Sequence, residues 1–177
     1  SKIPKALFMK NEYLTKLRSL NATIAVTFKT PKVSVLSNLL LEVPSPLSAK
    51  DTDFFEREVF RQFYINMSRL VRFEFAAYPE DHSKEDNSFV PLHYHAAIRS
   101  ENDTKFLAVA PRKYAAVLES VYSKHFSNII IPIEPLWISK INHADIEKDY
   151  ELYVLKQYTP SKRLVTHEDF QLKSIAA

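Results

Sequence analysis

The sequence predicts an α+β domain in which helices flank a central antiparallel β-sheet of about five strands. Two observations lead to this fold class. Strand-like alternation of apolar and polar residues recurs in three separate segments, near residues 23–28, 71–77 and 92–98. Segments with helical periodicity lie before, between and after them. With 46% apolar residues, residues 1–177 fit one domain with a sizeable core, which a longer protein could contain.

The composition excludes several kinds of site. Gly is absent, so turns that need positive φ must fall to Asn and Asp, and Gly-rich phosphate loops are excluded. Cys is absent too, which excludes disulfides and thiolate zinc sites and fits a reducing, cytoplasmic location. No apolar run approaches the roughly 18 residues of a membrane span and no signal peptide is recognisable, so we expect no membrane partner. The net charge of +3 does not by itself predict a nucleic-acid binder.

The first part of the chain predicts a helix followed by a strand. Leucines recur at helical spacing over residues 5–20, which predicts a short amphipathic helix. Alternation over residues 23–28 is typical of a strand with one apolar face. Residues 33–42 fit a strand or a helix equally, and the prolines after them indicate a loop.

A long helix and a hairpin are predicted next. Large apolar side chains recur over residues 53–70, where Asp51 or Thr52 can cap the first turn of a helix. Residues 71–77 alternate as a strand, residues 78–89 form a polar loop, and residues 92–98 form a second strand entered from a proline. Two strands joined in this way are most simply an antiparallel hairpin.

The last third predicts shorter elements. Residues 106–109 fit a short strand, and Pro111 is expected to open a helix that ends near residue 125. Residues 129–138 contain a strand that two prolines confine to a sheet edge. A final helix is predicted from about residue 143 or 144 to residue 158, with Asn142 as a cap.

The second hairpin strand carries the first chemical motif, His93-Tyr94-His95. Strand side chains alternate, so both imidazoles point the same way and could hold one metal ion. A symmetrical loop would place Glu74 opposite His95 on that face, completing a set of three ligands. The loop segment Glu80-Asp81-His82 offers an alternative third ligand. A structural His pair and a solvated strand glutamate are the competing readings.

The final helix carries the second motif, Tyr153-Val154-Leu155-Lys156. A free phenol with a pKa near 10 is a poor nucleophile at neutral pH. Lys156, one helical turn away, could favour the Tyr153 anion or contact a phosphate. Tyr150 lies on nearly the same helical face and is a rival nucleophile, and Tyr153 could also be an ordinary exposed residue.

In chain order, a Thr-rich strand ending Thr27-Phe28, the His93-Tyr94-His95 strand and the Tyr153-Val154-Leu155-Lys156 helix resemble the HUH endonucleases, most of all single-tyrosine rolling-circle replication initiators. The resemblance covers roughly residues 21–162 and implies an RRM-like palm. It implies one Mn²⁺ or Mg²⁺ ion on His93, His95 and Glu74, although two imidazoles would suit Zn²⁺ or Ni²⁺ equally. Family members with two tyrosines space them four apart, whereas Tyr150 and Tyr153 are three apart, which favours Tyr153 as the single nucleophile.

The resemblance also implies a function. It implies an enzyme that nicks and rejoins single-stranded DNA at a replication or transfer origin through a covalent 5′-phosphotyrosine, starting rolling-circle replication of a plasmid or phage, with a helicase as a further partner. Relaxases and single-strand transposases share this chemistry. A hydrolytic metallo-phosphoesterase and a non-catalytic nucleic-acid-binding module are competing functions. Six cations could line a DNA path: Lys105, Arg112, Lys113, Lys140, Lys162 and Arg163.

Overall fold

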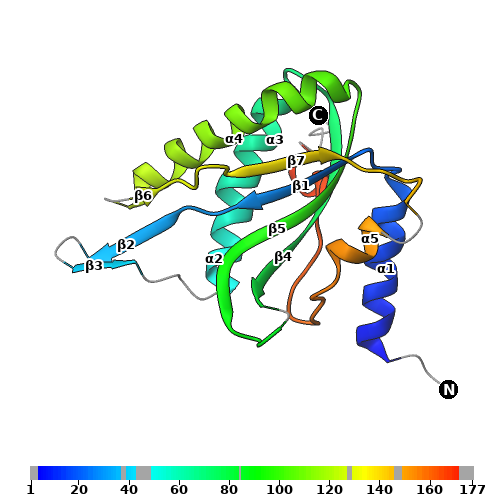
Figure 1. The fold of residues 1–177 in the computed structure, drawn as a ribbon, viewed down its shortest axis with the longest axis horizontal. Coiled ribbons are helices and arrows are strands. Elements are labelled where there is room, and N and C mark those ends of the chain that lie inside the picture. Colours follow the sequence, from blue (N-terminus) through cyan, green and yellow to red (C-terminus); the bar gives the residue numbers. More distant parts are fainter. Residues whose placement is uncertain are drawn as a thin grey trace, which may run out of the picture.

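The structure, a computed structural model, describes residues 4–36, 39–42, 49–83, 85–126, 129–145 and 149–171. It confirms the predicted fold class, because helices flank a five-stranded antiparallel sheet with the strand order β7-β1-β5-β4-β8 (Figure 1). The five strands are β1 (Ile24–Lys29), β4 (Phe73–His82), β5 (Phe89–Ser100), β7 (Leu136–Lys140) and β8 (Val165–Thr166). β4 and β5 form the predicted hairpin at its centre.

A second, smaller antiparallel sheet extends beyond β1, with the strand order β3-β2-β6 (Figure 1). Its strands are β2 (Lys32–Leu36), β3 (Leu39–Glu42) and β6 (Ile129–Ile130). The described part of residues 33–42, whose pattern fitted a strand or a helix equally, is therefore strand.

One face of the central sheet is covered by a layer of helices, namely α2 (Ala49–Phe54), the π-helical segment η1 (Phe55–Phe60), α3 (Arg61–Ser68) and α4 (Asp103–His125). Aromatic rings fill the space between them and the sheet. Phe28 packs edge-on against Phe60 at 4.9 Å and against Tyr114 at 5.1 Å between ring centroids. Tyr94 packs edge-on against Phe60 at 4.8 Å. Buried aromatic side chains with this edge-to-face geometry make this layer the principal core.

The other face is covered only in part, by α1 (Lys5–Ser19) and the short helix α5 (Tyr150–Val154). Ala76 and Ala97 on the sheet are small, which lets Leu17 of α1 and Val154 of α5 pack closely against it. This second core lies toward one end of the face. Beyond it, the same face carries the polar residues of the candidate site.

Several boundaries differ from the sequence predictions. Residues 106–109 are helix, because the Asn102 side chain accepts a hydrogen bond from the Lys105 N–H and caps α4 ahead of them. Pro111 therefore lies inside α4 and does not open it. The predicted helix over residues 53–70 is divided among α2, η1 and α3. The last helix is shorter than predicted and begins at Tyr150; residues 146–148 of the predicted helix lie outside the described residues.

Two local predictions are confirmed. The helix and the strand expected in the first thirty residues are α1 and β1. Among the described residues, the positive φ angles fall on Asn21 and Asn87, as expected of a chain without Gly. None of the described helices combines the length and the apolar character that crossing a membrane requires.

Candidate metal and active site

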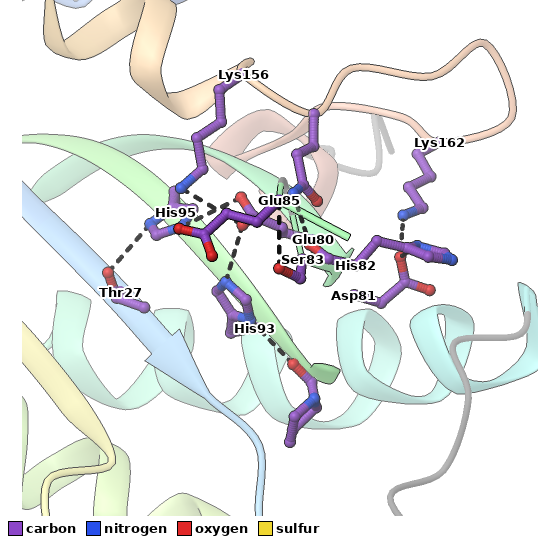
Figure 2. A network of polar contacts seen from close by, with 12 residues as sticks. Thr27, Glu80, Asp81, His82, Ser83, Glu85, His93, His95, Lys156 and Lys162 are labelled. Carbon is purple, nitrogen blue, oxygen red and sulfur yellow. Dashed lines mark hydrogen bonds and ion pairs between the residues drawn. The ribbon is translucent and has the colours of Figure 1, made fainter. Parts of the chain in front are cut away.

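The β4–β5 hairpin sets the position of the candidate metal ligands. Its register pairs Glu80 with His93 and Tyr78 with His95. Opposed residues of an antiparallel pair point to the same side of the sheet, so Glu80 shares a face with both imidazoles. β4 extends through residues that were expected to be loop, and a bulge follows Glu80. The outer end of the hairpin thus gathers one carboxylate and two imidazoles on the incompletely covered face (Figure 2).

The three side chains converge through specific atoms. Glu80 Oε2 lies 3.3 Å from His95 Nε2, and Glu80 Oε1 lies 3.5 Å from His93 Nε2. One ligand atom from each residue falls within 4.8 Å of the other two. These are hard and intermediate donors of the kind that divalent ions accept, so this group could hold a metal ion.

The Nδ1 atoms of both histidines, which point away from Glu80, have polar partners of their own. His93 Nδ1 lies 2.9 Å from the Pro91 carbonyl oxygen, which can only accept, so Nδ1 carries the proton and leaves the Nε2 lone pair free when the ring is neutral. His95 Nδ1 lies 3.2 Å from Thr27 Oγ1 of β1 (Figure 2). Partners of this kind fix the orientation of metal-binding imidazoles.

Burial and charge favour the ionisation states that a metal ion requires. Glu80 and His95 are only 7% and 6% exposed. Burial alone would raise the pKa of Glu80, but hydrogen bonds and charge from His93 and His95 outweigh it and hold that pKa well below its usual range. Burial lowers the pKa of His95, although Glu80 opposes this shift, and so favours the neutral ring that a metal ion needs. Among the described residues, His95 Nε2 is buried and its 3.3 Å contact with Glu80 Oε2 lacks good hydrogen-bond geometry, which is unusual for a polar atom that binds nothing else.

Tyr153 and Lys156 stand beside this group. The Tyr153 ring packs edge-on against His95, with 5.0 Å between centroids, and Tyr153 remains 45% exposed. Lys156 Nζ lies 4.1 Å from the centre of the Tyr153 ring and 3.4 Å from Glu80 Oε1. Lys156 therefore places a positive charge between the carboxylate and the tyrosine, as Figure 2 shows for its approach to Glu80.

The rival tyrosine is placed differently. The Tyr150 hydroxyl donates a hydrogen bond to the Ala96 carbonyl oxygen at 2.6 Å, and the Tyr150 ring stacks on the ring of Tyr153. Burial raises the pKa of Tyr150 above its usual value. A hydroxyl that is bonded to the sheet backbone and hard to ionise is a poor candidate nucleophile, so the geometry favours Tyr153.

A second polar cluster ties the α5 region to β4. Asp81 is buried, and its Oδ1 lies 2.5 Å from both Lys162 Nζ and His82 Nδ1 (Figure 2). The Gln157 side-chain amide donates to the His82 carbonyl oxygen. These contacts hold the segment after α5 against the strand that carries Glu80.

The prediction that Glu74 lies opposite His95 is wrong. The register pairs Glu74 with Arg99, six residues before Glu80 and so about 20 Å away along the strand. Glu74 is on the correct face, but its side chain is 58% exposed and lies 3.5 Å from His167 Nε2. The alternative within Glu80-Asp81-His82 supplies the carboxylate that faces both imidazoles, because β4 continues to His82 and the hairpin turn lies later in the chain than predicted.

The six cations predicted to line a DNA path are scattered. Lys105, Arg112 and Lys113 belong to α4, on the opposite face of the sheet. Arg163 is paired with Glu56 at 2.9 Å, and Lys140 lies at the far end of β7 opposite Ile24. Of the six, Lys162 stands closest to the candidate site, through Asp81. Their contact with DNA stays a prediction.

No protein-family model and no curated protein matches the chain. Among solved structures, the fold is similar to the N-terminal nuclease domain of non-structural protein 1 of minute virus of mice, described as having a unique Zn²⁺ coordination in the active-site pocket and a novel mode of DNA recognition at the origin of replication. The TM-score is 0.45 at 10% identity, over 84% of this chain and 77% of that one. At this degree of similarity the match carries no conclusion about function.

Proposed function

We propose that residues 1–177 form one HUH-type endonuclease domain that nicks and rejoins single-stranded DNA through a covalent phosphotyrosine. The observation that carries this proposal is the packing of the exposed Tyr153 against His95, within a group of two imidazoles and one carboxylate that could hold a metal ion. A metal-ligand group next to an accessible phenol suits phosphoryl transfer better than simple binding.

The residues present fit a divalent ion. His93, His95 and Glu80 would hold it, and His95 Nε2, which is buried and contacts Glu80 Oε2 without good hydrogen-bond geometry, would gain a strong partner. Carboxylate and phosphate oxygens favour Mn²⁺ or Mg²⁺, and two imidazoles suit Zn²⁺ or Ni²⁺ as well. When bound, the ion would polarise a phosphate oxygen and neutralise charge in the transition state.

The chain's own residues would carry the transfer. The Tyr153 oxygen attacks the scissile phosphorus, a Tyr–O–P bond forms, and the bond from phosphorus to the 3′ oxygen breaks. The phenolic proton passes to solvent and the departing 3′ oxygen takes a proton from solvent, so no net charge is created. Lys156 favours the phenolate and the negatively charged phosphate through its ammonium group. Because the phosphodiester energy is retained in the new bond, a 3′ hydroxyl can reverse the step.

The proposed substrate is single-stranded DNA at an origin, either for rolling-circle replication or for transfer. A 5′ linkage to Tyr153 would leave a free 3′ hydroxyl that can prime synthesis. A helicase would be the natural partner of such an initiator. Relaxases and single-strand transposases share this chemistry, so the side chains support the reaction without distinguishing replication, transfer and transposition.

The test uses a pool of short single strands of mixed sequence, incubated with Mn²⁺ and analysed by denaturing electrophoresis. A label at the 3′ end should move with the protein, whereas a label at the 5′ end should appear on a free, shorter fragment. Tyr153→Phe removes only the hydroxyl and should abolish both products while Mn²⁺ binding persists. Tyr64→Phe, on α3 across the sheet, is the matched control and should react normally.

Two outcomes would redirect the proposal. If Tyr153→Phe still forms the adduct and Tyr150→Phe does not, the nucleophile is misassigned within α5. If neither forms an adduct but both cleave, water is the nucleophile and the protein is a hydrolytic metallo-phosphoesterase. Metal-independent binding without cleavage by the wild type would indicate a non-catalytic nucleic-acid-binding module.

A further inference from the structure

A row of four residues runs across the central sheet through the candidate site. The register pairs Tyr78 with His95, His95 with Thr27, and Thr27 with Trp137 of the edge strand β7. Directly opposed side chains share a face, so Trp137 lies on the face that carries the metal ligands. Its neighbour Leu136 is buried in the core on the opposite side. Two strand spacings separate His95 from Trp137, a distance of about 10 Å.

Exposure rises along this row from the covered end to the edge. Tyr78 is buried beneath α1 and α5, His95 is almost buried, and Thr27 is half-buried. Trp137 is 46% exposed, and within the described part of the chain its ring contacts no other aromatic ring. A half-exposed indole is a large apolar surface left open directly beside a polar site.

A cation accompanies the indole. Lys29, at the end of β1, is paired with His93 and lies on the same face as Thr27. Its backbone N–H donates to the Pro135 carbonyl oxygen at 2.9 Å, which fixes this corner against the start of β7. In the portion of the chain that the structure describes, the Lys29 ammonium forms no ion pair. The open end of the face therefore offers one flat aromatic ring and one unneutralised positive charge next to the metal ligands.

We propose that Trp137 is a stacking platform for an unpaired nucleobase close to the scissile phosphate, and that Lys29 contacts the phosphate between that base and the active site. The proposal rests on the proposed function for its choice of nucleic acid as the ligand. Alternating base and phosphate contacts along a groove are how proteins hold single strands without reading sequence, and every base presents a π-face to an aromatic ring. A nucleic-acid strand would enter over the β7 edge and run along the row toward His95.

The platform has a built-in reporter, because Trp137 is the only tryptophan of the sequence. The Tyr153→Phe variant, which cannot react, is titrated with a short single-stranded oligonucleotide while indole fluorescence is followed. Stacking should quench the emission and shield the indole from acrylamide. An abasic oligonucleotide of the same length should bind more weakly and leave the emission unchanged, which separates base stacking from phosphate contact. A duplex of the same sequence should also fail to quench.

Variants make the assignment specific. Trp137→Ala should weaken binding about tenfold, and Trp137→Phe should recover part of it, because a smaller ring still stacks. Lys29→Gln should reduce the dependence of affinity on salt by about one phosphate contact and keep the quenching. Lys124→Gln, which removes an exposed lysine from α4 on the other side of the sheet, is the matched control and should change neither.

The outcomes distinguish this proposal from the proposed function. If the wild type forms an adduct but the oligonucleotide does not quench, and Trp137→Ala binds normally, the platform is wrong and the nuclease proposal stands. If quenching occurs but no adduct forms under any condition, the platform stands and the nuclease proposal fails. If Trp137→Ala changes the oligomeric state in light scattering and leaves DNA affinity unchanged, this edge binds a second copy of the chain, which overturns the proposal.

Discussion

On the face of the central sheet covered by α3 and α4, β5 contributes Leu92 and Tyr94, both buried among apolar side chains. On the other face, the same strand contributes His93 and His95 beside Glu80, and of these three His93 is partly exposed to solvent. Both faces belong to the same strand and the same hydrogen-bonded sheet, so the difference comes from the elements that pack on each face. The helices on one face cover it completely and form the core, whereas α1 and α5 cover only part of the other face and leave polar side chains grouped at one end. Substitutions of adjacent residues of β5 should therefore have different effects: those on the covered face should lower stability, and those on the open face should lower metal binding and activity.

The largest expected effect is on the open face. His93→Ala and His95→Ala should each lower adduct formation by about 10³-fold or more, because charge in the transition state loses its stabilisation. Mn²⁺ affinity, measured by calorimetry, should fall with it, while circular dichroism stays that of the wild type. His125→Ala, at the end of α4, is the control. Unchanged Mn²⁺ binding by both site variants would remove the metal assignment.

The adjacent residue on the covered face should behave in the opposite way. Tyr94→Ala should lower the free energy of unfolding by about 3–5 kcal/mol, because it leaves a cavity among Phe55 and Phe60. Tyr94→Phe removes only the hydroxyl that donates to Glu56, and should cost about 1 kcal/mol. Urea unfolding measures both. Loss of Mn²⁺ affinity in folded Tyr94→Phe would show that the two faces are coupled.

A smaller effect is expected from the residue behind the site. Thr27→Val keeps the shape of the side chain but removes the hydroxyl that meets His95 Nδ1 at 3.2 Å. Metal affinity should fall about 10–100-fold, since the ring loses the partner that orients it. Thr27→Ser keeps the hydroxyl and should recover most of the affinity. Equal affinities for Thr27→Val and the wild type would mean that the imidazole is oriented by packing alone.

The smallest effect concerns the buried charge of the covered face. Burial raises the pKa of Glu56, with Arg163 opposing it, so the folded state keeps the Glu56 proton to a higher pH than the unfolded state does. The corresponding stability is present below the ordinary carboxyl pKa and is lost as pH rises through the folded pKa. Glu56→Gln cannot ionise, so its stability relative to the wild type should increase with pH in urea titrations. A stability difference that stays constant with pH would contradict this assignment.

The parts of the site that depend on the two-residue alternation of a β-strand could be predicted from the sequence. His93 and His95 share a face because strand side chains alternate, and the hairpin was predicted from two alternating segments. Glu80 was placed in a loop, because Pro79 and its polar neighbours are typical of turns. The position of Glu80 could have been predicted by continuing the two-residue alternation of β4, which places Glu74, Ala76, Tyr78 and Glu80 on one face of the strand.

The remaining differences arise from tertiary contacts that a local pattern does not contain. Residues 106–109 form a short apolar run that suits a strand, but the Asn102 cap starts a helix ahead of them, and Phe106 and Ala110 are then buried together in the core. The position of Trp137 in line with His95 depends on pairing between β1 and β7, which are more than one hundred residues apart in the chain. No period in either segment indicates that pairing.

The small size of α5 has a consequence for the reaction cycle. This helix spans only Tyr150–Val154 and is held against the sheet by Val154, Leu155 and the hydrogen bond of the Tyr150 hydroxyl. The segment after it contacts β4 through the polar side chains of Gln157 and Lys162. Segments with few buried contacts open at a lower free energy than the strands of a central sheet. Backbone amides of α5 should therefore exchange with deuterium faster than those of β5. If α5 opens, a DNA end attached to Tyr153 would move with the helix. His93 and His95 would keep their positions on the sheet and could act on the next DNA strand to bind.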